Sequence, residues 1–119
     1  MARILLAEDD DQMRAFLTRG LRRAGHAVDP APDGAAALVQ AHEANYDLLL
    51  ADVVMPGLDG IELARRVSLC QPGIHVMFIT GFAAVALQDG GIATNRPRVL
   101  AKPFHLRHLI DEIENLLMQ

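Results

Sequence analysis

Charged and hydroxyl side chains follow directly after several short apolar runs of this chain. Glu8 and Asp9 come after "RILLA", and Asp52 comes after "DLLLA". Thr80 ends the run "IHVMFIT", and Lys102 follows "RVLA". Carboxylates that lie close together repel one another unless a cation joins them, and Mg²⁺ prefers carboxylate, water and phosphate oxygens. Three carboxylates with a hydroxyl and an ammonium group therefore indicate chemistry on a phosphoryl group.

These residue types define a candidate reaction, the transfer of a phosphoryl group to Asp52. A carboxylate can attack phosphorus and form an aspartyl phosphate, and Asp52 is the lone acid at the end of its run. Glu8 and Asp9 would hold a magnesium ion, and Lys102 would neutralise the phosphoryl oxygens. The Thr80 hydroxyl would fix the orientation of the group. The prediction depends on the order of these residues at the ends of the first, third, fourth and fifth strands, because each alone has an ordinary structural explanation.

The elements that must position these residues alternate along the chain. Apolar runs typical of buried strands lie at 3–7, 26–32, 47–51, 74–80 and 98–101. Helical patterns lie between and after them, at 13–24, 33–45, 61–67, 83–87 and 106–117. This alternation predicts an α/β fold with a doubly wound, five-stranded parallel sheet and helices on both faces. Ligands of such sheets bind outside the carboxyl ends of the strands, where the charged residues lie.

Several polar residues and prolines are predicted to serve the fold. Asp10 or Asp11 would cap the first helix, and Asp33 the second. Pro30 and Pro32 favour an edge position for the strand at 26–32. In the loop after Asp52, a turn with glycine and proline would bend the chain. The histidines lack metal-ligand spacing with the acids and are interpreted as surface or strand-end residues: His26, His42, His75, His105 and His108.

The composition predicts one small globular domain. The chain has 119 residues, of which 51% are hydrophobic and 22% charged, so it can bury one core. Its net charge of −4 argues against nucleic-acid binding. The only basic cluster, Arg19, Arg22 and Arg23, is interpreted as a solvated helix face. Cys70 is the one cysteine, so no internal disulfide can form, and it is interpreted as a structural thiol.

The sequence also bears on where the protein works. No apolar run approaches the length of about 18 residues that a membrane span needs. The first segment, "MARILLAEDDD", has too short an apolar run and is too acidic for a signal peptide. We therefore expect a cytoplasmic protein without membrane contact, and a monomer.

The segments "ILLAEDD", "DLLLADVVMPGLDG", "FITG" and "AKPF" resemble, in this order, the receiver domain of two-component response regulators. The resemblance extends over residues 3–117. It implies a single receiver domain spanning 1–119 without an output domain, and a flavodoxin-like sheet with strand order 2-1-3-4-5. It also implies a histidine kinase or a histidine phosphotransferase as the partner that donates the phosphoryl group.

The resemblance assigns roles to individual residues. Asp52 would be the phosphoacceptor, Thr80 the switch hydroxyl and Lys102 the phosphate-binding lysine. Mg²⁺ would be held by the carboxylates of Glu8, Asp9 and Asp52 and by the backbone carbonyl of Val54. The family usually has the bond before the proline of "AKPF" in the cis form.

Two positions depart from the pattern of the family. Receivers commonly carry Tyr or Phe three residues before the lysine, where this chain has Val99, so an aromatic switch is missing. The residue after the hydroxyl is Gly81 rather than the usual alanine. Signal relay is therefore predicted to involve the segment 81–97, with Phe82 and Phe104 as exposed contact residues.

A closer resemblance concerns the biological role. The segments "MARILLAEDDD", "MRAFLTR", "DGIELARR" and "MFITGFAAVAL" are similar to single-domain regulators of alphaproteobacterial cell cycles that act as adaptors for the ClpXP protease. This implies the ClpX unfoldase as a partner of the unphosphorylated state. A phosphate shuttle in a multistep phosphorelay would carry the same motifs and stays an open alternative.

Two enzymatic or ligand-binding alternatives are weaker. Phosphohydrolases of the haloacid dehalogenase type also use an aspartate after a strand, but they carry a second acid two residues on, where this chain has Val54. A nucleotide-binding fold would require a G-x-G-x-x-G or Walker sequence, and neither is present. We therefore expect a signalling module, with at most slow self-dephosphorylation, rather than an enzyme.

Overall fold

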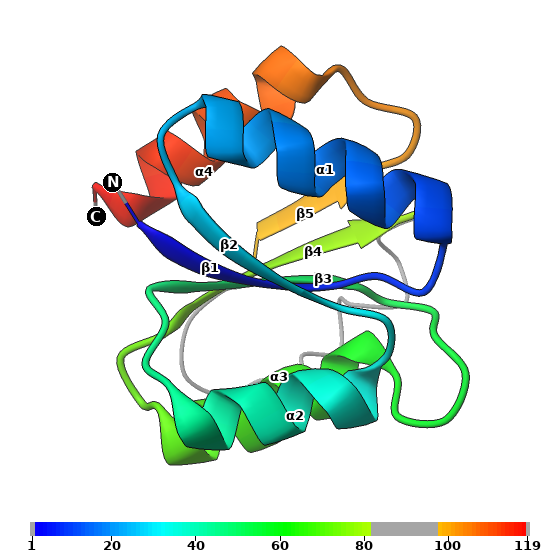
Figure 1. Cartoon of the computed structure of the whole chain (residues 1–119), viewed down its shortest axis with the longest axis vertical. Coiled ribbons are helices and arrows are strands. Elements are labelled where there is room, and N and C mark those ends of the chain that lie inside the picture. The colour runs from blue at the N-terminus through cyan, green and yellow to red at the C-terminus, as the bar shows by residue number, and fades with distance from the viewer. Residues whose placement is uncertain (1, 82–97, 119) are drawn as a thin grey trace.

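A computed structural model describes residues 2–81 and 98–118 of the chain. Strands and helices alternate through most of it, as Figure 1 shows. The strands are β1 (Arg3–Ala7), β2 (Ala27–Ala31), β3 (Leu48–Asp52), β4 (His75–Thr80) and β5 (Arg98–Ala101). The helices are α1 (Asp11–Arg23), α2 (Gly34–Glu43), α3 (Gly60–Cys70) and α4 (Leu106–Leu117). The helix predicted at 83–87 lies outside the described residues.

The five strands form one parallel sheet in the order β2-β1-β3-β4-β5, which confirms the predicted architecture. Helices α1 and α4 cover one face of the sheet, and α2 and α3 cover the other (Figure 1). The strand order reverses between β1 and β3, so their carboxyl ends lie at the switch point where open α/β sheets bind ligands. β2 is an edge strand, as its prolines predicted. No helix in the described ranges is long and apolar enough to cross a membrane.

The core consists of two apolar layers, one on each face of the sheet. Alternate residues of a strand point to opposite faces, so neighbours along each apolar run separate into different layers. Leu48 and Leu50 pack with α1 and α4, whereas Leu49 and Ala51 pack with α2 and α3. All four are fully buried. β3 is thereby held on both faces, which fixes the position of Asp52 at its end.

Aspartate side chains begin the first three helices. Asp10 accepts a hydrogen bond from the Met13 backbone N–H at 2.9 Å, so Asp10 rather than Asp11 is the cap of α1. Asp33 caps α2 as predicted, and Asp59 caps α3, each at 2.8 Å from a backbone nitrogen. Each bond satisfies one of the amide groups that a helix start leaves free. These caps set where the helices begin relative to the strand ends.

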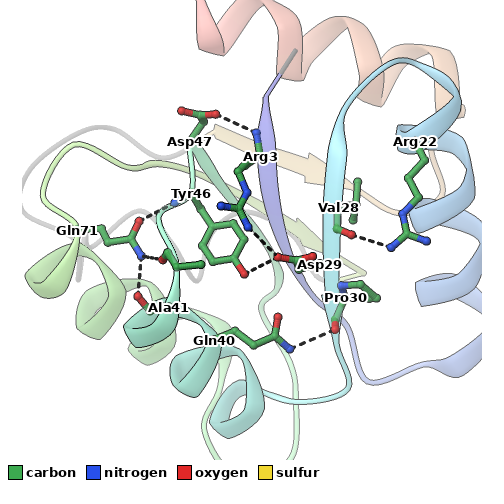
Figure 2. A network of polar contacts seen from close by, with 11 residues as sticks. Arg3, Arg22, Val28, Asp29, Pro30, Gln40, Ala41, Tyr46, Asp47 and Gln71 are labelled. Atoms are coloured by element: carbon green, nitrogen blue, oxygen red, sulfur yellow. Dashed lines mark hydrogen bonds and ion pairs between the residues drawn. The ribbon is translucent and has the colours of Figure 1, made fainter.

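The outer edge of β2 is closed by side chains, which Figure 2 shows. Ala27 and Ala31 form backbone hydrogen bonds on the side of β1. Successive residues of a strand bond to opposite sides, so the carbonyls of Val28 and Pro30 face away from β1. The Val28 carbonyl accepts from the Arg22 guanidinium at 2.8 Å, and the Pro30 carbonyl accepts from the Gln40 amide at 3.4 Å. Pro30 has no N–H to offer. A second chain therefore finds few free backbone groups at this edge.

A polar network joins β1, β2 and the segment before β3 (Figure 2). The Tyr46 hydroxyl donates to Asp29 at 2.7 Å, and the Arg3 guanidinium lies 3.4 Å from the same carboxylate. The guanidinium carbon of Arg3 also lies 5.2 Å from the centre of the Tyr46 ring. Burial and the hydrogen bond to Asp29 raise the pKa of Tyr46 to about 12. Gln71 bonds the Tyr46 backbone N–H at 2.8 Å and thereby ties this segment to the end of α3.

One of the histidines predicted to lie at the surface or at a strand end is buried. His26, next to the start of β2, is buried, with 8% of its surface exposed. Its Nδ1 accepts from the Ala2 backbone N–H at 3.2 Å, and its Nε2 lies 3.8 Å from a Glu114 carboxylate oxygen. The residue closes the contact between the beginning of the chain and α4, which are far apart in sequence. His26 directly precedes β2, which agrees with the strand-end alternative of the prediction. Its burial was not predicted, because the contact with Glu114 comes from a helix far away in sequence.

Candidate phosphoryl-transfer site

Three of the predicted site carboxylates meet at the carboxyl end of the sheet. One ligand oxygen from each of Glu8, Asp9 and Asp52 lies within 4.8 Å of the others. Glu8 is fully buried, Asp52 is 6% exposed, and Asp9 lies on the surface. β1 and β3 are neighbours, so the residues that end them are brought together by the strand order. The site thus has two buried carboxylates, Glu8 and Asp52, and one carboxylate, Asp9, that is open to solvent.

Lys102 joins the two buried carboxylates. Its Nζ lies 3.0 Å from Asp52 Oδ2 and 3.3 Å from Glu8 Oε1, and 24% of its side chain is exposed. Burial alone would lower the pKa of Lys102. The hydrogen bond to Asp52 and the charges of both carboxylates outweigh burial, so the pKa is raised. Lys102 is therefore a fixed positive charge at the site.

Glu8 is the least solvated carboxyl group of the three. Burial raises the pKa of Glu8 from its ordinary 4.5 to about 7, and the negative charge of Asp52 acts in the same direction. The Asp10 backbone N–H, which donates to Glu8 Oε2 at 3.1 Å, and the charge of Lys102 oppose this increase. A cation bound beside Glu8 would favour its ionised form.

Thr80 ends β4 next to the strand that carries Asp52. In the register of the sheet Asp52 pairs with Ile79, so Thr80 lies one residue beyond it. Thr80 is 2% exposed, and its carbonyl accepts from the Lys102 backbone N–H at 2.7 Å. The two residues predicted to contact a phosphoryl group are thus connected through their backbones. The peptide bond between Lys102 and Pro103 is cis.

The loop after Asp52 folds back toward it. The Val54 N–H donates to Asp52 Oδ1 at 3.1 Å, and Gly57 adopts a left-handed φ of 75° in the predicted turn. Gly60 begins α3 against the end of β3, and a Cβ at this position would overlap the Asp52 backbone carbonyl. The sequence predicted the turn, but the need for glycine at position 60 appears only from this close approach.

A further residue of the site was not predicted from the sequence. The Arg14 guanidinium of α1 donates to the Glu8 backbone carbonyl at 3.0 Å and pairs with Asp11 at 2.6 Å. It therefore ties the loop that carries the acidic pair to the first helix. An arginine on the surface of an amphipathic helix gives no signal of such a contact in the sequence.

Val99, Phe82 and Phe104 were the residues discussed for signal relay. Val99 is half-buried and packs against the core layer under α2 and α3. Phe104 was predicted to be exposed, and this is wrong: it is half-buried and packs against the layer under α1 and α4. Phe82 lies outside the described residues.

The donor set suits a hard divalent cation. All three clustered ligands are carboxylates, which Mg²⁺ prefers, and the nearby ammonium and hydroxyl groups suit phosphoryl oxygens. Both oxygens of the Asp52 carboxylate accept hydrogen bonds, one from the Val54 N–H and one from Lys102. The arrangement can hold a metal ion and place one carboxylate oxygen against an incoming phosphorus atom.

The chain belongs to the family of response regulator receiver domains, whose sequence model matches residues 4–114. Proteins of this family are signalling modules that interact with histidine kinases. The fold and the acidic cluster described above are consistent with this membership, which confirms the resemblance noted in the sequence.

Curated relatives agree with this assignment. The response regulator receiver protein CpdR of Brucella abortus (strain 2308) is 52% identical over 118 residues, covering 99% of this chain and 98% of that protein. The transcriptional regulatory protein TcrA of Mycobacterium tuberculosis (strain ATCC 25618 / H37Rv) is 34% identical over 96% of this chain and 45% of its own. The chain therefore spans about half the length of that transcriptional regulator.

Solved receiver structures have the same fold. The chemotaxis protein CheY4 of Vibrio cholerae superposes with a TM-score of 0.89 at 27% identity, covering 98% of both chains. The receiver domain of the hybrid histidine kinase CckA gives a TM-score of 0.81 at 35% identity, covering 97% of this chain and 98% of its own. TrrA of Thermotoga maritima, solved in complex with Mg²⁺ and BeF, gives 0.85 at 26% identity, covering 98% and 99%.

Proposed function

We propose that this protein accepts a phosphoryl group on Asp52 in the presence of Mg²⁺ and thereby switches its binding to partner proteins. The observation that carries the proposal is the position of the Asp52 carboxylate. It lies 3.0 Å from the Lys102 ammonium group and within 4.8 Å of the acidic pair Glu8 and Asp9. An aspartyl phosphate is stabilised by positive charge near its oxygens. Lys102 would supply this charge on one side, and a metal ion held by the acidic pair would supply it on the other.

The residues divide the work of the reaction. A carboxylate oxygen of Asp52 attacks the phosphorus atom of the donor, and the bond from phosphorus to the donor's leaving group breaks. Lys102 pairs with the phosphoryl oxygens, and the Thr80 hydroxyl donates to one of them. Glu8, Asp9, Asp52 and the Val54 carbonyl would hold Mg²⁺. When bound, this ion supplies positive charge to the phosphoryl oxygens.

The test of this chemistry is labelling by a small phosphodonor. Incubation with acetyl phosphate and MgCl₂ should add one phosphoryl group, measured as intact mass, and EDTA should prevent it. Asp52→Asn should accept none. Asp33→Asn is the matched control, because it makes the same change at a helix cap that asparagine can replace. Label that persists in Asp52→Asn and maps to another residue would refute the assignment.

We also propose that the protein is a single receiver domain that acts through a partner rather than through its own output domain. The likeness to CpdR over almost the whole of both chains supports this. By resemblance to the single-domain adaptors of the ClpXP protease, the partner of the unphosphorylated state would be ClpX. The phosphoryl donor would be a histidine kinase or a histidine phosphotransferase. The protein would act in the cytoplasm, and it would do so as a monomer.

Binding of ClpX decides this part of the proposal. The unphosphorylated protein should bind ClpX, and beryllofluoride with Mg²⁺, a phosphoryl mimic, should weaken the binding. Asp52→Ala should bind ClpX whether or not beryllofluoride is present. Equal binding of the wild type in both conditions would contradict the switch. No binding in either would contradict the adaptor role and favour a phosphate shuttle, while the labelling experiment would still stand.

A further inference from the structure

A groove lined by arginines lies between α1 and the edge strand β2, and one of these arginines, Arg14, also bonds the Glu8 carbonyl. Its volume is about 650 Å³, within the range of small-molecule sites. The lining includes four arginines of α1, a threonine and the outer edge of β2: Arg14, Thr18, Arg19, Arg22, Arg23 and Pro30. Such a basic groove is unexpected on a protein whose net charge is −4. It contains Arg19, Arg22 and Arg23, which were expected to form a solvated helix face.

The arginines differ in how they are engaged. Arg14 and Arg22 bond to the Glu8 and Val28 carbonyls, so their guanidinium groups are held against the protein, as Figure 2 shows for Arg22. Arg19 and Arg23 are exposed and make no hydrogen bond or ion pair with any residue that the structure describes. Like charges three or four residues apart on a helix repel one another. An anion placed between these side chains would relieve that repulsion.

Thr18, in the lining of the groove, provides an independent observation. Only 8% of its surface is exposed, and its Oγ1 has no hydrogen-bond partner within 2–81 and 98–118. A buried hydroxyl without a partner destabilises the fold, and such groups are rare in native proteins. Thr18 lines the groove together with the arginines, so its covered hydroxyl could donate to a bound acceptor once neighbouring side chains move aside.

We propose that this groove binds a small phosphorylated molecule, such as a nucleoside diphosphate. Guanidinium groups recognise phosphate oxygens through paired hydrogen bonds, and the Thr18 hydroxyl supplies a further donor. Pro30 and Ala15 give the groove an apolar wall for the uncharged part of the ligand. Asp11 also lines the groove, but its carboxylate is paired with Arg14 at 2.6 Å, which limits its repulsion of an anion.

Phosphate-bearing probes test this proposal in the absence of Mg²⁺, when the acidic cluster repels anions. Titration of the ¹⁵N-labelled protein with ADP, or with inorganic pyrophosphate, in EDTA should shift amide signals of α1 and β2 to saturation. Tighter binding of ADP than of pyrophosphate indicates a nucleotide, and equal binding indicates a site for the phosphate group alone. Absence of saturation with both probes would overturn the proposal, as would shifts confined to other elements.

Substitutions separate a built site from general attraction of anions. The double variant Arg19→Gln/Arg23→Gln should weaken binding by about tenfold or more, because two charge-assisted contacts are lost. Arg66→Gln removes an exposed positive charge on α3, on the other face of the sheet, and should change the affinity by less than about twofold. An equal loss of affinity in the two variants would mean that the probe is attracted by positive charge in general, and it would overturn the proposal.

Thr18→Val tests the role of the hydroxyl. This variant keeps the shape of the side chain and removes a buried group that has no partner, so the ligand-free protein should be as stable as the wild type or more stable. Its affinity for the probe should nevertheless fall by about fivefold or more. Unchanged affinity, or a clear loss of stability without ligand, would show that the hydroxyl serves the fold and would overturn its assignment to the ligand.

Discussion

Substitution of Glu8 by glutamine should remove a large part of the pH dependence of stability from the metal-free protein. The pKa of Glu8 is about 7 in the folded chain, against an ordinary value of 4.5. Between these values the folded state keeps a proton that the unfolded state releases. The free energy of unfolding must therefore fall as the pH rises through this window.

The size of the effect follows from the two pKa values. Each pKa unit corresponds to about 1.4 kcal/mol, so raising the pH from 5 to 8 should cost the wild type roughly 2 to 3 kcal/mol through Glu8 alone. Lys102 does not contribute in this range. Its raised pKa supports stability at every pH below the ordinary value of 10.5, and that support is lost only at higher pH.

Urea unfolding in EDTA at a series of pH values measures the effect. The difference in free energy of unfolding between wild type and Glu8→Gln should change by roughly 2 to 3 kcal/mol from pH 5 to pH 8, with the variant relatively more stable at pH 8. Glutamine keeps an oxygen that can accept from the Asp10 N–H or from Lys102. Parallel pH profiles for the two proteins would refute the reasoning, because Glu8 would then be ionised in the folded state throughout.

The stabilisation of the protein by Mg²⁺ provides a second measurement of the ionisation of Glu8. Under the proposed function, Mg²⁺ would bind the ionised carboxylates of the folded state and stabilise it by mass action. It should therefore raise the melting temperature of the wild type more at pH 8 than at pH 5. An equal increase at both values would mean that the acidic cluster binds the ion without loss of a proton from Glu8.

Three other predictions concern single positions. Asp9→Ala should weaken Mg²⁺ binding without lowering the stability of the metal-free protein, because it removes repulsion from the cluster; a marked loss in a melt with EDTA would contradict this. Gly60→Ala should destabilise the fold by about 1–3 kcal/mol and slow labelling by acetyl phosphate, because the new Cβ overlaps the Asp52 carbonyl. Gly73→Ala, where a Cβ meets no atom within 4 Å, is its control. Tyr46, the only tyrosine, should ionise near pH 12 in a spectroscopic titration, and Asp29→Asn should lower that value; stability should fall by about 1 kcal/mol as the pH rises from 10 to 11.

Local patterns were sufficient to predict the framework. Unbroken apolar runs such as 47–51 indicated strands buried on both faces, and the alternation with helices indicated a parallel sheet. Pro30 placed β2 at the edge because proline lacks the N–H that a central strand needs. Once the strands are parallel, the residues that end them must meet at one side. Proximity of Glu8, Asp9 and Asp52 could therefore be predicted without coordinates.

Features that depend on distances between remote segments could not be predicted in this way. The hold of Arg14 on the Glu8 carbonyl depends on how α1 crosses the sheet. The close approach of Gly60 to the Asp52 carbonyl depends on where α3 begins, and the burial of His26 depends on α4. Phe104 was expected on the surface as a contact residue in place of the missing aromatic switch, but it packs against the core layer under α1 and α4. Sequence patterns report the period of an element and not the neighbours that tertiary packing brings to it.

The balance of charges at the site gives a reason why a metal ion and a phosphoryl group should act together. Three carboxylates against one ammonium group leave an excess of negative charge when all are ionised. Without a metal ion, the fold relieves this excess by keeping a proton on Glu8 near neutral pH. A divalent cation bound at the cluster would replace that proton, and it would then balance the further negative charge that phosphorylation of Asp52 would bring. Lys102 would turn from the carboxylates toward the phosphoryl oxygens, and the backbone bond from its N–H to Thr80 would couple β4 and β5 to that movement.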